Sequence, residues 1–393
     1  MKILCVFGRN NYGDPKRGMS PEYAAFVPAL TRLGHEVHHF ESWDRRNYRD
    51  LGALNEALLN EVERIRPDVM LTVQMHYELW LETLAAIRAR GDVATISWTT
   101  DDSWKYREVS RFIGHAYHAM TTTYSYVVPR YHADGIFNVL LTQWAASSEW
   151  LADPLAARDC QYQATFIGTA NTDRRELVAR LLSRGIEVAC FGYGWPAGPL
   201  ASDEIPRIMR ESVISINVAA SKGENQIKAR TFEVPGAGGF LLTGPAQDLE
   251  KFFVPGAEIA IYQNVDDLGD KILFYLAHPD ERDRIAGAGH ARVLREHTYE
   301  RRLAEVINFA LAAKERNVAS PPTRSFAQVL ETHRLTPFLR VLRVLLMGAS
   351  RRVFGPERGP RAARRLVFEL SWRLAGRHTF TAAGWPGRLF PHE

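Results

Sequence analysis

The sequence has few cysteines and no long apolar run. Its three cysteines, Cys5, Cys160 and Cys190, are far apart in a chain of 393 residues. This spacing excludes a cysteine metal site and favours buried free thiols in a reducing cytoplasm. We expect no leader segment, and no apolar run approaches the ~20 residues that span a bilayer. His115 and His118 lack a clear third ligand, so we expect no metal.

Several common catalytic and cofactor motifs are also missing. The sequence contains no Walker A motif, no HExxH and no GxSxG. Neither of the two β-α-β openings described below carries GxGxxG, which disfavours NAD or FAD. We therefore expect no cofactor.

Charge is distributed unevenly. The whole chain carries a net charge of +4, but the segment from Ala319 onward has 13 Arg, no Lys and 4 acidic residues, or +9, which leaves −5 for the rest. The basic residues alternate with apolar ones. We expect this extension to form helices that either dock on the remainder of the protein or lie on an anionic membrane surface. The last fifteen residues, which include Trp385, are expected to lack regular structure.

A β-α-β pattern occurs twice. The apolar strand Lys2–Phe7 is followed by a polar loop, a helix over 21–33 and a strand over 36–40, and the same order returns in 164–191. The segments RLGHEVHHF and SRGIEVACF are the matching parts. Two Rossmann-like domains in tandem follow from this repeat, with parallel sheets and ligands at the carboxyl ends of the strands. We expect domains over 1–155 and 156–316 and a helical extension over 317–393.

The second predicted domain is organised around a charged helix with a glycine stop. The strand Val213–Val218 leads through a polar loop to the run KARTFEVPGAGGFLLT. Glycines end the helix because only Gly enters left-handed or tightly approached conformations without steric cost. A helix N-terminus and two cations beside a sheet edge suit an anionic ligand. Farther on, Asp266 is expected to cap a helix, and Gly287 and Gly289 to break the one that starts at Pro279.

This stretch resembles a known family. The ordered motifs Phe-Glu, Gly-Gly-Phe-Leu-Leu-Thr, Pro-Gly-x-Glu-Ile, His-Pro-x-Glu-Arg and His-Thr-Tyr are similar to the donor domain of GT-B glycosyltransferases, and more closely to the CgeB-like, spore-maturation-protein-like subgroup. The resemblance covers 164–313 well and 1–150 weakly. It implies two Rossmann-like domains that face each other across a cleft. The N-terminal domain would bind the acceptor and the second would bind the nucleotide-sugar donor.

The resemblance also implies donor-site residues. Lys228 and Arg230 would lie near the diphosphate, and Glu233 would accept the ribose hydroxyls, since two carboxylate oxygens suit two vicinal hydroxyls. From charge pattern alone, the same residues also fit a solvated helix face with an i,i+3 ion pair. The sequence departs from the family pattern at Pro235, which a helix interior tolerates poorly. The predicted donor site also includes Gly238 and Gly239.

Two further strand ends in this domain carry candidate donor contacts. The loop Gly168, Thr169 and Asn171 follows the first strand, and its small residues let backbone N–H groups approach a phosphate. A plain turn between strand and helix fits it nearly as well. Tyr193 ends the next strand and either stacks on a nucleobase or packs against its neighbours.

The first domain offers candidates for the acceptor side. Asp101, Asp102 and His76 are the possible general bases, although an aspartate after a strand is more often a helix cap. The loop after the first strand is expected to reach the cleft and touch a sugar; its candidates are Arg9, Asn10, Tyr12 and Gly13.

These observations converge on one function and two alternatives. We expect a metal-independent glycosyltransferase that uses a nucleotide-diphosphate sugar and a glycan, lipid-linked or protein acceptor, without nucleic acid. The chain would be cytoplasmic, with peripheral contact to the inner face of the membrane through its arginines. The alternatives are a nucleotide-sugar epimerase of the same fold and a non-catalytic scaffold of envelope assembly.

Overall fold

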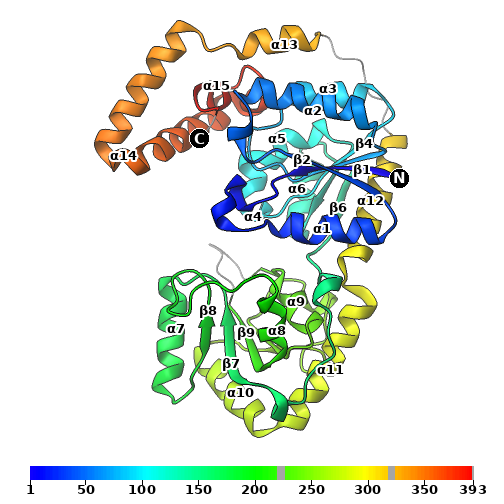
Figure 1. Ribbon diagram of the computed structural model, residues 1–393, viewed down its shortest axis with the longest axis vertical. Coiled ribbons are helices and arrows are strands. Elements are labelled where there is room, and N and C mark those ends of the chain that lie inside the picture. Colours follow the sequence, from blue (N-terminus) through cyan, green and yellow to red (C-terminus); the bar gives the residue numbers. More distant parts are fainter. Residues whose placement is uncertain (219–225, 317–323, 392–393) are drawn as a thin grey trace. The chain divides into compact units, whose positions relative to one another are not determined.

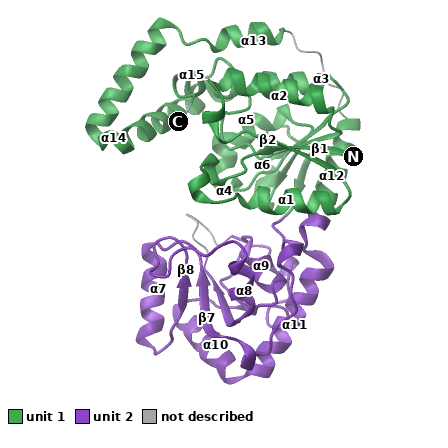
Figure 2. Ribbon diagram, in the orientation of Figure 1, with its two compact units in different colours: residues 1–142, 303–393 green, residues 143–302 purple. Residues whose placement is uncertain are grey.

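The computed structural model describes residues 1–218, 226–316 and 324–391, and they form two compact units. Unit 1 comprises 1–142 with 303–393, and unit 2 comprises 143–302 (Figure 2). From the sequence, domain boundaries are expected at 155/156 and 316/317. The contacts instead return the chain to unit 1 within the helix α12 (Tyr299–Glu315), so the extension belongs with the N-terminal part.

Unit 1 contains a six-stranded parallel sheet in the order β2-β1-β3-β4-β5-β6. Residues Ile3 to Phe7 of β1 have no exposed surface, as expected for a central parallel strand covered on both faces. Figure 1 shows the sheet between α1 on one side and α2 and α3 on the other. The strands are β1 (Lys2–Phe7), β2 (Glu36–Glu41), β3 (Val69–Thr72), β4 (Ala94–Ser97), β5 (Ala119–Thr122) and β6 (Val139–Leu141).

The helices of unit 1 connect these strands and then continue into the extension. In the first part of the chain they are α1 (Pro21–Arg32), α2 (Leu51–Ile65), α3 (Leu81–Ala89), α4 (Asp102–Lys105), α5 (Arg111–Ile113) and α6 (Val128–Ala133). After α12 come α13 (Phe326–His333), α14 (Pro337–Ala375) and α15 (Trp385–Leu389). The end of the chain is thus partly helical, contrary to expectation, because Phe380, Leu389 and Phe390 are buried and order it.

The second part of α14 docks on the body of unit 1. Phe368, Trp372 and Phe380 belong to the same apolar core as the residues of α2 and α3. Arg365 lies 3.2 Å from Glu108 in an ion pair that joins α14 to the segment after α4. Docking, one of the two expected roles of the extension, is therefore what this part of it does.

Unit 2 contains a five-stranded parallel sheet in the order β11-β10-β9-β7-β8. Helix α7 contacts α10, and both α8 and α11 contact α9. The strands are β7 (Tyr162–Ile167), β8 (Ala189–Phe191), β9 (Ser212–Asn217), β10 (Leu241–Thr243) and β11 (Ala260–Ile261); the helices are α7 (Thr172–Ser183), α8 (Glu204–Arg210), α9 (Arg230–Gly236), α10 (Val265–Ala277) and α11 (Pro279–Glu296).

The repeated β-α-β plan is confirmed, with β1-α1-β2 in unit 1 and β7-α7-β8 in unit 2. Two local expectations were wrong. Helix α11 runs without a break through Gly287 and Gly289; a Cβ on Gly289 would lie 2.3 Å from the carbonyl oxygen of Glu258, so this glycine permits close packing. The side chain that caps α10 is that of Asn264, not Asp266.

Candidate functional site

The loop after β7 in unit 2 is held by backbone and side-chain hydrogen bonds. Gly168 donates to the carbonyl oxygen of Phe191 at 2.8 Å and accepts from the indole of Trp195 at 2.9 Å. Asn171 caps α7 by accepting from the amide of Arg174 at 2.9 Å. The loop therefore forms a turn between β7 and α7, which was the alternative to a phosphate-binding loop in the sequence-based prediction.

Arg174 lies at the carboxyl ends of the strands of unit 2 and is not among the residues predicted from the sequence. Its two terminal nitrogens each lie 2.7 Å from a carbonyl oxygen, one of Thr169 and the other of Val218. Burial lowers the pKa of Arg174, and Tyr262 opposes that shift. Arg174 thus joins the carboxyl ends of β7 and β9. The only sequence signal was its place one turn after Asn171.

An aromatic residue just after β8 is accessible. Tyr193 has 57% of its surface exposed, and its carbonyl oxygen accepts from the amide of Ala170 at 2.8 Å. Trp195, two residues on, instead packs edge-on against Phe166. Of these two, Tyr193 is the one with a ring face open to a ligand.

Helix α9 brings two of the predicted donor residues together. Arg230 and Glu233 form an ion pair one turn apart, and both side chains are partly buried. Lys228 lies just before the helix and is half-buried. Since α9 has only seven residues, its dipole adds little at its N-terminus, and the positive field expected here comes from the two cations. Part of the polar loop that leads to α9 lies outside the described residues.

Pro235 is accommodated at the end of α9. Its carbonyl oxygen accepts from the amide of Gly238 at 3.0 Å and lies 2.9 Å from Nδ1 of His290 on α11. The helix extends one residue past the proline, to Gly236. Pro235 is therefore tolerated in the last turn of α9, and Glu233 lies within the helix.

The glycines after α9 approach the chain's own backbone. Gly238 has a φ of +80°, and a Cβ there would lie 2.5 Å from the carbonyl oxygen of Ala152. A Cβ on Gly239 would lie 2.6 Å from the carbonyl oxygen of Met209. Both glycines are buried. Packing against 152–154 and α8 accounts for them, and their assignment to a donor site stays a prediction.

In unit 1, the two aspartates after β4 have different surroundings. The Asp102 carboxylate has no exposed surface and accepts three hydrogen bonds, from Thr99 at 2.8 Å, Ser110 at 2.7 Å and Tyr131 at 2.8 Å. Burial raises the pKa of Asp102, and the three donors oppose that shift. Asp101 is only partly buried. Of the pair, Asp101 is the one a substrate could reach.

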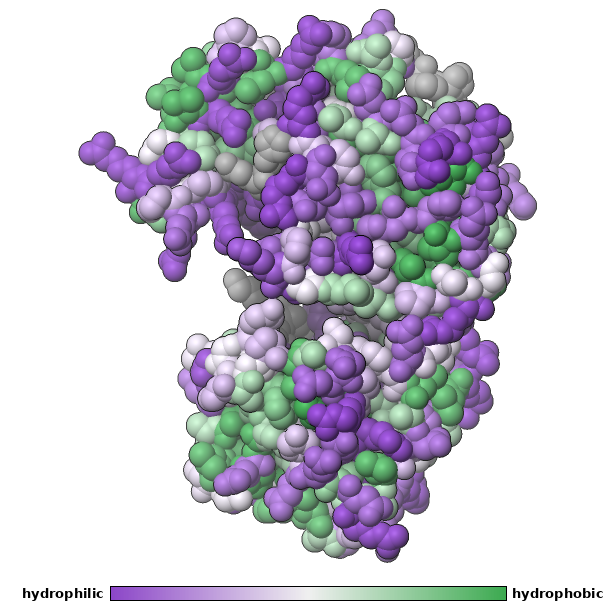
Figure 3. Space-filling view, in the orientation of Figure 1, coloured by the Kyte–Doolittle hydropathy of each residue, from purple (hydrophilic) through white to green (hydrophobic). Residues whose placement is uncertain are grey.

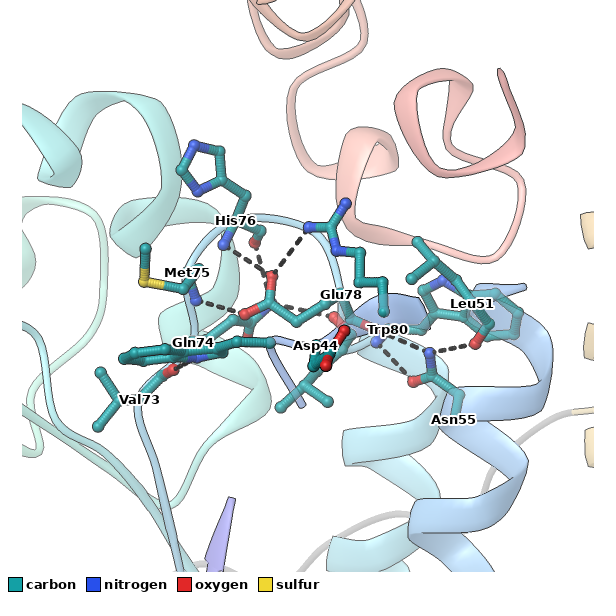
Figure 4. Close-up of polar contacts among 12 residues, drawn as sticks. Asp44, Leu51, Asn55, Val73, Gln74, Met75, His76, Glu78 and Trp80 are labelled. Carbon is teal, nitrogen blue, oxygen red and sulfur yellow. Dashed lines mark hydrogen bonds and ion pairs between the residues drawn. The ribbon is translucent and has the colours of Figure 1, made fainter. Parts of the chain in front are cut away.

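His76 lies in the loop after β3, which Glu78 organises (Figure 4). The Glu78 carboxylate accepts from the backbone amides of Met75 and His76, while the His76 ring points away from it. The ring packs against Phe368 of α14 at a centroid distance of 5.2 Å. Burial and the nearby charges of Lys105 and Arg45 lower the pKa of His76 to about 3. A histidine with so low a pKa is a weak general base.

The charged neighbours of this loop are buried or partly buried. Lys105 donates to the carbonyl oxygen of Gln74 at 3.0 Å, and burial lowers its pKa. Arg45 lies 3.8 Å from Glu78 and stacks over the ring of Tyr77. Lys105 and Glu78 could not be selected from the sequence, because nothing in their local pattern separates them from surface charges.

The loop after β1 is compact and carries an exposed tyrosine. Arg9 donates its amide to Glu41 at 2.7 Å, and Asn10 forms a backbone bridge with Met19. Tyr12 has a φ of 55° and 68% of its surface exposed, whereas Gly13 is buried. A non-glycine residue in the left-handed region is strained, and such residues cluster at functional sites. Tyr12 is therefore the member of this loop best placed for a ligand.

The described residues contain neither a cluster of metal-ligating side chains nor a helix that could span a membrane. Among residues 1–218, 226–316 and 324–391, no group of three or more His, Cys, Asp or Glu side chains is placed to hold a metal ion. Within the same ranges, every helix is too short or too polar to pass through a bilayer. Metal independence and location stay predictions.

Residues 174–308 match the family model described as Glycosyl transferase-like, and they lie inside the 164–313 stretch that carried the resemblance. No curated protein sequence matches the chain. Unit 2 thus contains almost all of the matched region.

Several solved structures share the fold. Sucrose-phosphate synthase from Thermosynechococcus elongatus has a TM-score of 0.58 at 11% identity and covers 80% of this chain and 100% of its own. A glycosyltransferase from Rickettsia africae has a TM-score of 0.54 at 11% identity, with 80% and 99% covered. Anabaena HepE in complex with UDP-glucose has a TM-score of 0.53 at 11% identity, also with 80% and 99% covered. The chain therefore has an α/β fold of two parallel sheets like that of GT-B glycosyltransferases, with a glycosyl transferase-like region over residues 174–308.

Proposed function

We propose that the protein is a glycosyltransferase that moves a sugar from a nucleoside-diphosphate sugar to an acceptor hydroxyl. The observation that carries this proposal is the family match over 174–308, which includes the Arg230–Glu233 pair and begins just after the loop that follows β7. The likeness to HepE, whose structure holds UDP-glucose, supports a uridine nucleotide as the first donor to test. Membership of the CgeB-like subgroup rests on motif order alone.

The donor half of the reaction needs positive charge more than proton transfer. The acceptor oxygen bonds to the anomeric carbon of the sugar while the bond from that carbon to the diphosphate breaks, and the nucleoside diphosphate leaves with the electron pair. In our assignment, Lys228 and Arg230 stabilise the leaving diphosphate, which would make a metal unnecessary. Glu233 accepts the ribose hydroxyls, and its pairing with Arg230 fixes the carboxylate in one orientation.

The acceptor half needs a group that takes the hydroxyl proton. Of the three candidates in unit 1, we favour Asp101. The Asp102 carboxylate is enclosed by three hydroxyl donors, and the low pKa of His76 makes it a weak base. Tyr12, on the loop after β1, is our candidate for contact with a sugar.

Donor binding is the sharpest test. Isothermal titration of the protein with UDP, GDP, ADP, TDP and CMP should find one nucleotide that binds, and Glu233→Gln should weaken it at least about tenfold by removing a charged hydrogen-bond acceptor. Glu281→Gln is the matched control, because Glu281 also pairs with an arginine one turn away, Arg284, but lies on the exposed face of α11. Equal affinities for Glu233→Gln and the original protein would refute the site.

Two further measurements separate the alternative functions from the proposed one. A nucleotide-sugar epimerase converts the donor without acceptor, so product analysis with donor alone detects it. A non-catalytic scaffold shows no thermal stabilisation by any nucleotide of the panel. Transfer of sugar that requires both donor and acceptor supports the proposal.

A further inference from the structure

Helix α14 consists of two segments, and the first extends away from the body of unit 1 (Figure 1). The break is at Gly355, whose φ of 82° lies in the left-handed region, and Pro356 follows it. We call residues 337–354 the α14 arm. At a rise of 1.5 Å per residue the arm is about 27 Å long.

One face of the arm is covered by the rest of the extension. Leu339, Leu346 and Met347 pack against a small core of Ala363, Val367, Leu389 and Phe390. Near the break, Ser350 donates to the carbonyl oxygen of Gly359 at 2.7 Å. A Cβ on Gly359 would lie 2.6 Å from the backbone of Arg351, so the two segments of α14 are in close contact there. The arm is therefore held in place.

The opposite face of the arm is apolar and exposed to solvent. Phe338, Val341, Val344 and Leu345 are 74%, 60%, 66% and 65% exposed. Positions 338, 341 and 345 are spaced by three and four residues, so they share one side of the helix, with 344 beside them. Figure 3 shows hydrophobic side chains in this part of the molecule (upper left) with hydrophilic ones between them. Isolated exposed apolar residues are common, but four on one helix face are a candidate contact surface.

The charge beside this face has a single sign. Between residues 332 and 356 the sequence contains five arginines and no acidic residue. The side chains of Arg340, Arg343, Arg351 and Arg352 form no ion pair with any residue in the described ranges, although arginines elsewhere, such as Arg365 and Arg373, pair with Glu369. The arm thus presents uncompensated positive charge next to exposed apolar side chains.

We propose that the α14 arm is a docking surface for an anionic lipid bilayer, on which it lies parallel to the membrane plane. Such a bilayer places phosphate groups and acyl chains within a few ångströms of one another, and the arm carries arginines and large apolar side chains on one short helix. Nucleic acid would match the arginines and leave Phe338, Val341 and Leu345 in water. This binding does not depend on the proposed enzyme activity.

Co-sedimentation of the full-length protein with vesicles tests the proposal. The protein should pellet with vesicles that contain about a third phosphatidylglycerol in phosphatidylcholine, and remain in the supernatant with phosphatidylcholine alone. Raising the salt from 50 to 500 mM should reduce binding severalfold because it screens the arginines. The variants Phe338→Ser with Leu345→Ser, and Arg340→Glu with Arg352→Glu, should each lower the vesicle affinity at least about tenfold.

Matched controls separate the arm from the general surface. Phe137 and Leu182 are 72% and 58% exposed, and Arg49 and Arg158 have highly exposed side chains, all outside α14. Phe137→Ser with Leu182→Ser, and Arg49→Glu with Arg158→Glu, should keep full binding. Circular dichroism checks that every variant is folded. The proposal is overturned if the original protein fails to bind the anionic vesicles at low salt, or if the control variants lose as much binding as the arm variants. It is also overturned if sedimentation velocity shows that the arm instead pairs two copies of the chain in the presence of vesicles.

Discussion

The Nε atom of Arg282 donates a hydrogen bond of 2.8 Å to the carbonyl oxygen of Val213, 69 residues away in the chain. Its terminal nitrogens donate to the carbonyl oxygens of Leu155, at 2.8 Å, and Ser212, at 2.9 Å. The side chain has no exposed surface. One guanidinium therefore joins α11, the start of β9 and the segment before β7, and the arginine of the His-Pro-x-Glu-Arg motif has a structural role in unit 2.

Replacing Arg282 by alanine should destabilise unit 2. Two buried carbonyl oxygens and a partly buried one would lose a donor, so we expect the free energy of unfolding to fall by more than about 3 kcal/mol. Amide hydrogen exchange at β7 and β9 measures this locally. Arg284→Ala is the matched control on the same helix; the Arg284 side chain is about half exposed, and its loss should leave stability nearly unchanged. Comparable protection in the two variants would contradict the role of Arg282.

Two glycines of unit 2 should respond to alanine in opposite directions. At Gly238 the φ of +80° and the carbonyl of Ala152 both oppose a Cβ, so Gly238→Ala should destabilise the protein by about 1–3 kcal/mol. Gly287 lies inside α11 with nothing within 4 Å of a Cβ, and Gly287→Ala should stabilise it by about 0.5–1 kcal/mol. Urea unfolding of the two variants measures both changes in the free energy of unfolding. If Gly238→Ala kept full stability and lost only nucleotide binding, the glycine would belong to the donor site.

A buried histidine should make unit 1 sensitive to acid. Nδ1 of His118 accepts from the amide of Thr95 at 3.0 Å, and burial lowers the pKa of His118 to about 4. Because this is below the usual ~6.5 of an unfolded chain, the folded state prefers the neutral ring. Its stabilisation is complete above pH ~6.5 and is lost as the pH falls toward 4.

The size of this effect can be measured by urea unfolding at pH 7.5 and 5. With solvent screening allowed for, we expect His118 to account for about 1 kcal/mol of the loss between these two pH values. His118→Asn should abolish that share, since the amide oxygen can still accept from Thr95 and does not titrate. His132→Asn, at an exposed position of the same unit, is the control. An acid dependence that survives in His118→Asn would assign the effect to other groups.

The parallel architecture was predictable because its signals are local. The run of apolar residues in β1, the glycine turn between α1 and β2, and the repetition of both in β7-α7-β8 lie within about 40 residues each. Pro279 marked the start of α11 for the same reason. Predictions were wrong where the role of a residue depends on a contact with a residue far away in the sequence. Gly289 looks like a helix breaker until the backbone of Glu258 is placed against it.

The candidate site was predictable in part. The charged residues of α9 were selected from the sequence, and the structure pairs Arg230 with Glu233. Arg174 and Lys105 were not selected, because their roles depend on carbonyl oxygens of Val218 and Gln74 that folding brings to them. Asp101 and Asp102 are adjacent and indistinguishable by pattern, and only the surrounding hydroxyl groups of Asp102 separate them.

By itself, the sequence determined the order of strands and helices, the tandem repeat and the concentration of arginines in the extension. These follow from hydrophobic periodicity, turn residues and composition, all of which act over short distances along the chain. Only the tertiary structure decided which arginine is buried at three carbonyl oxygens, which glycines meet a neighbouring backbone and which face of α14 is covered. Those outcomes depend on close packing between residues that are far apart in sequence, and no local pattern encodes it.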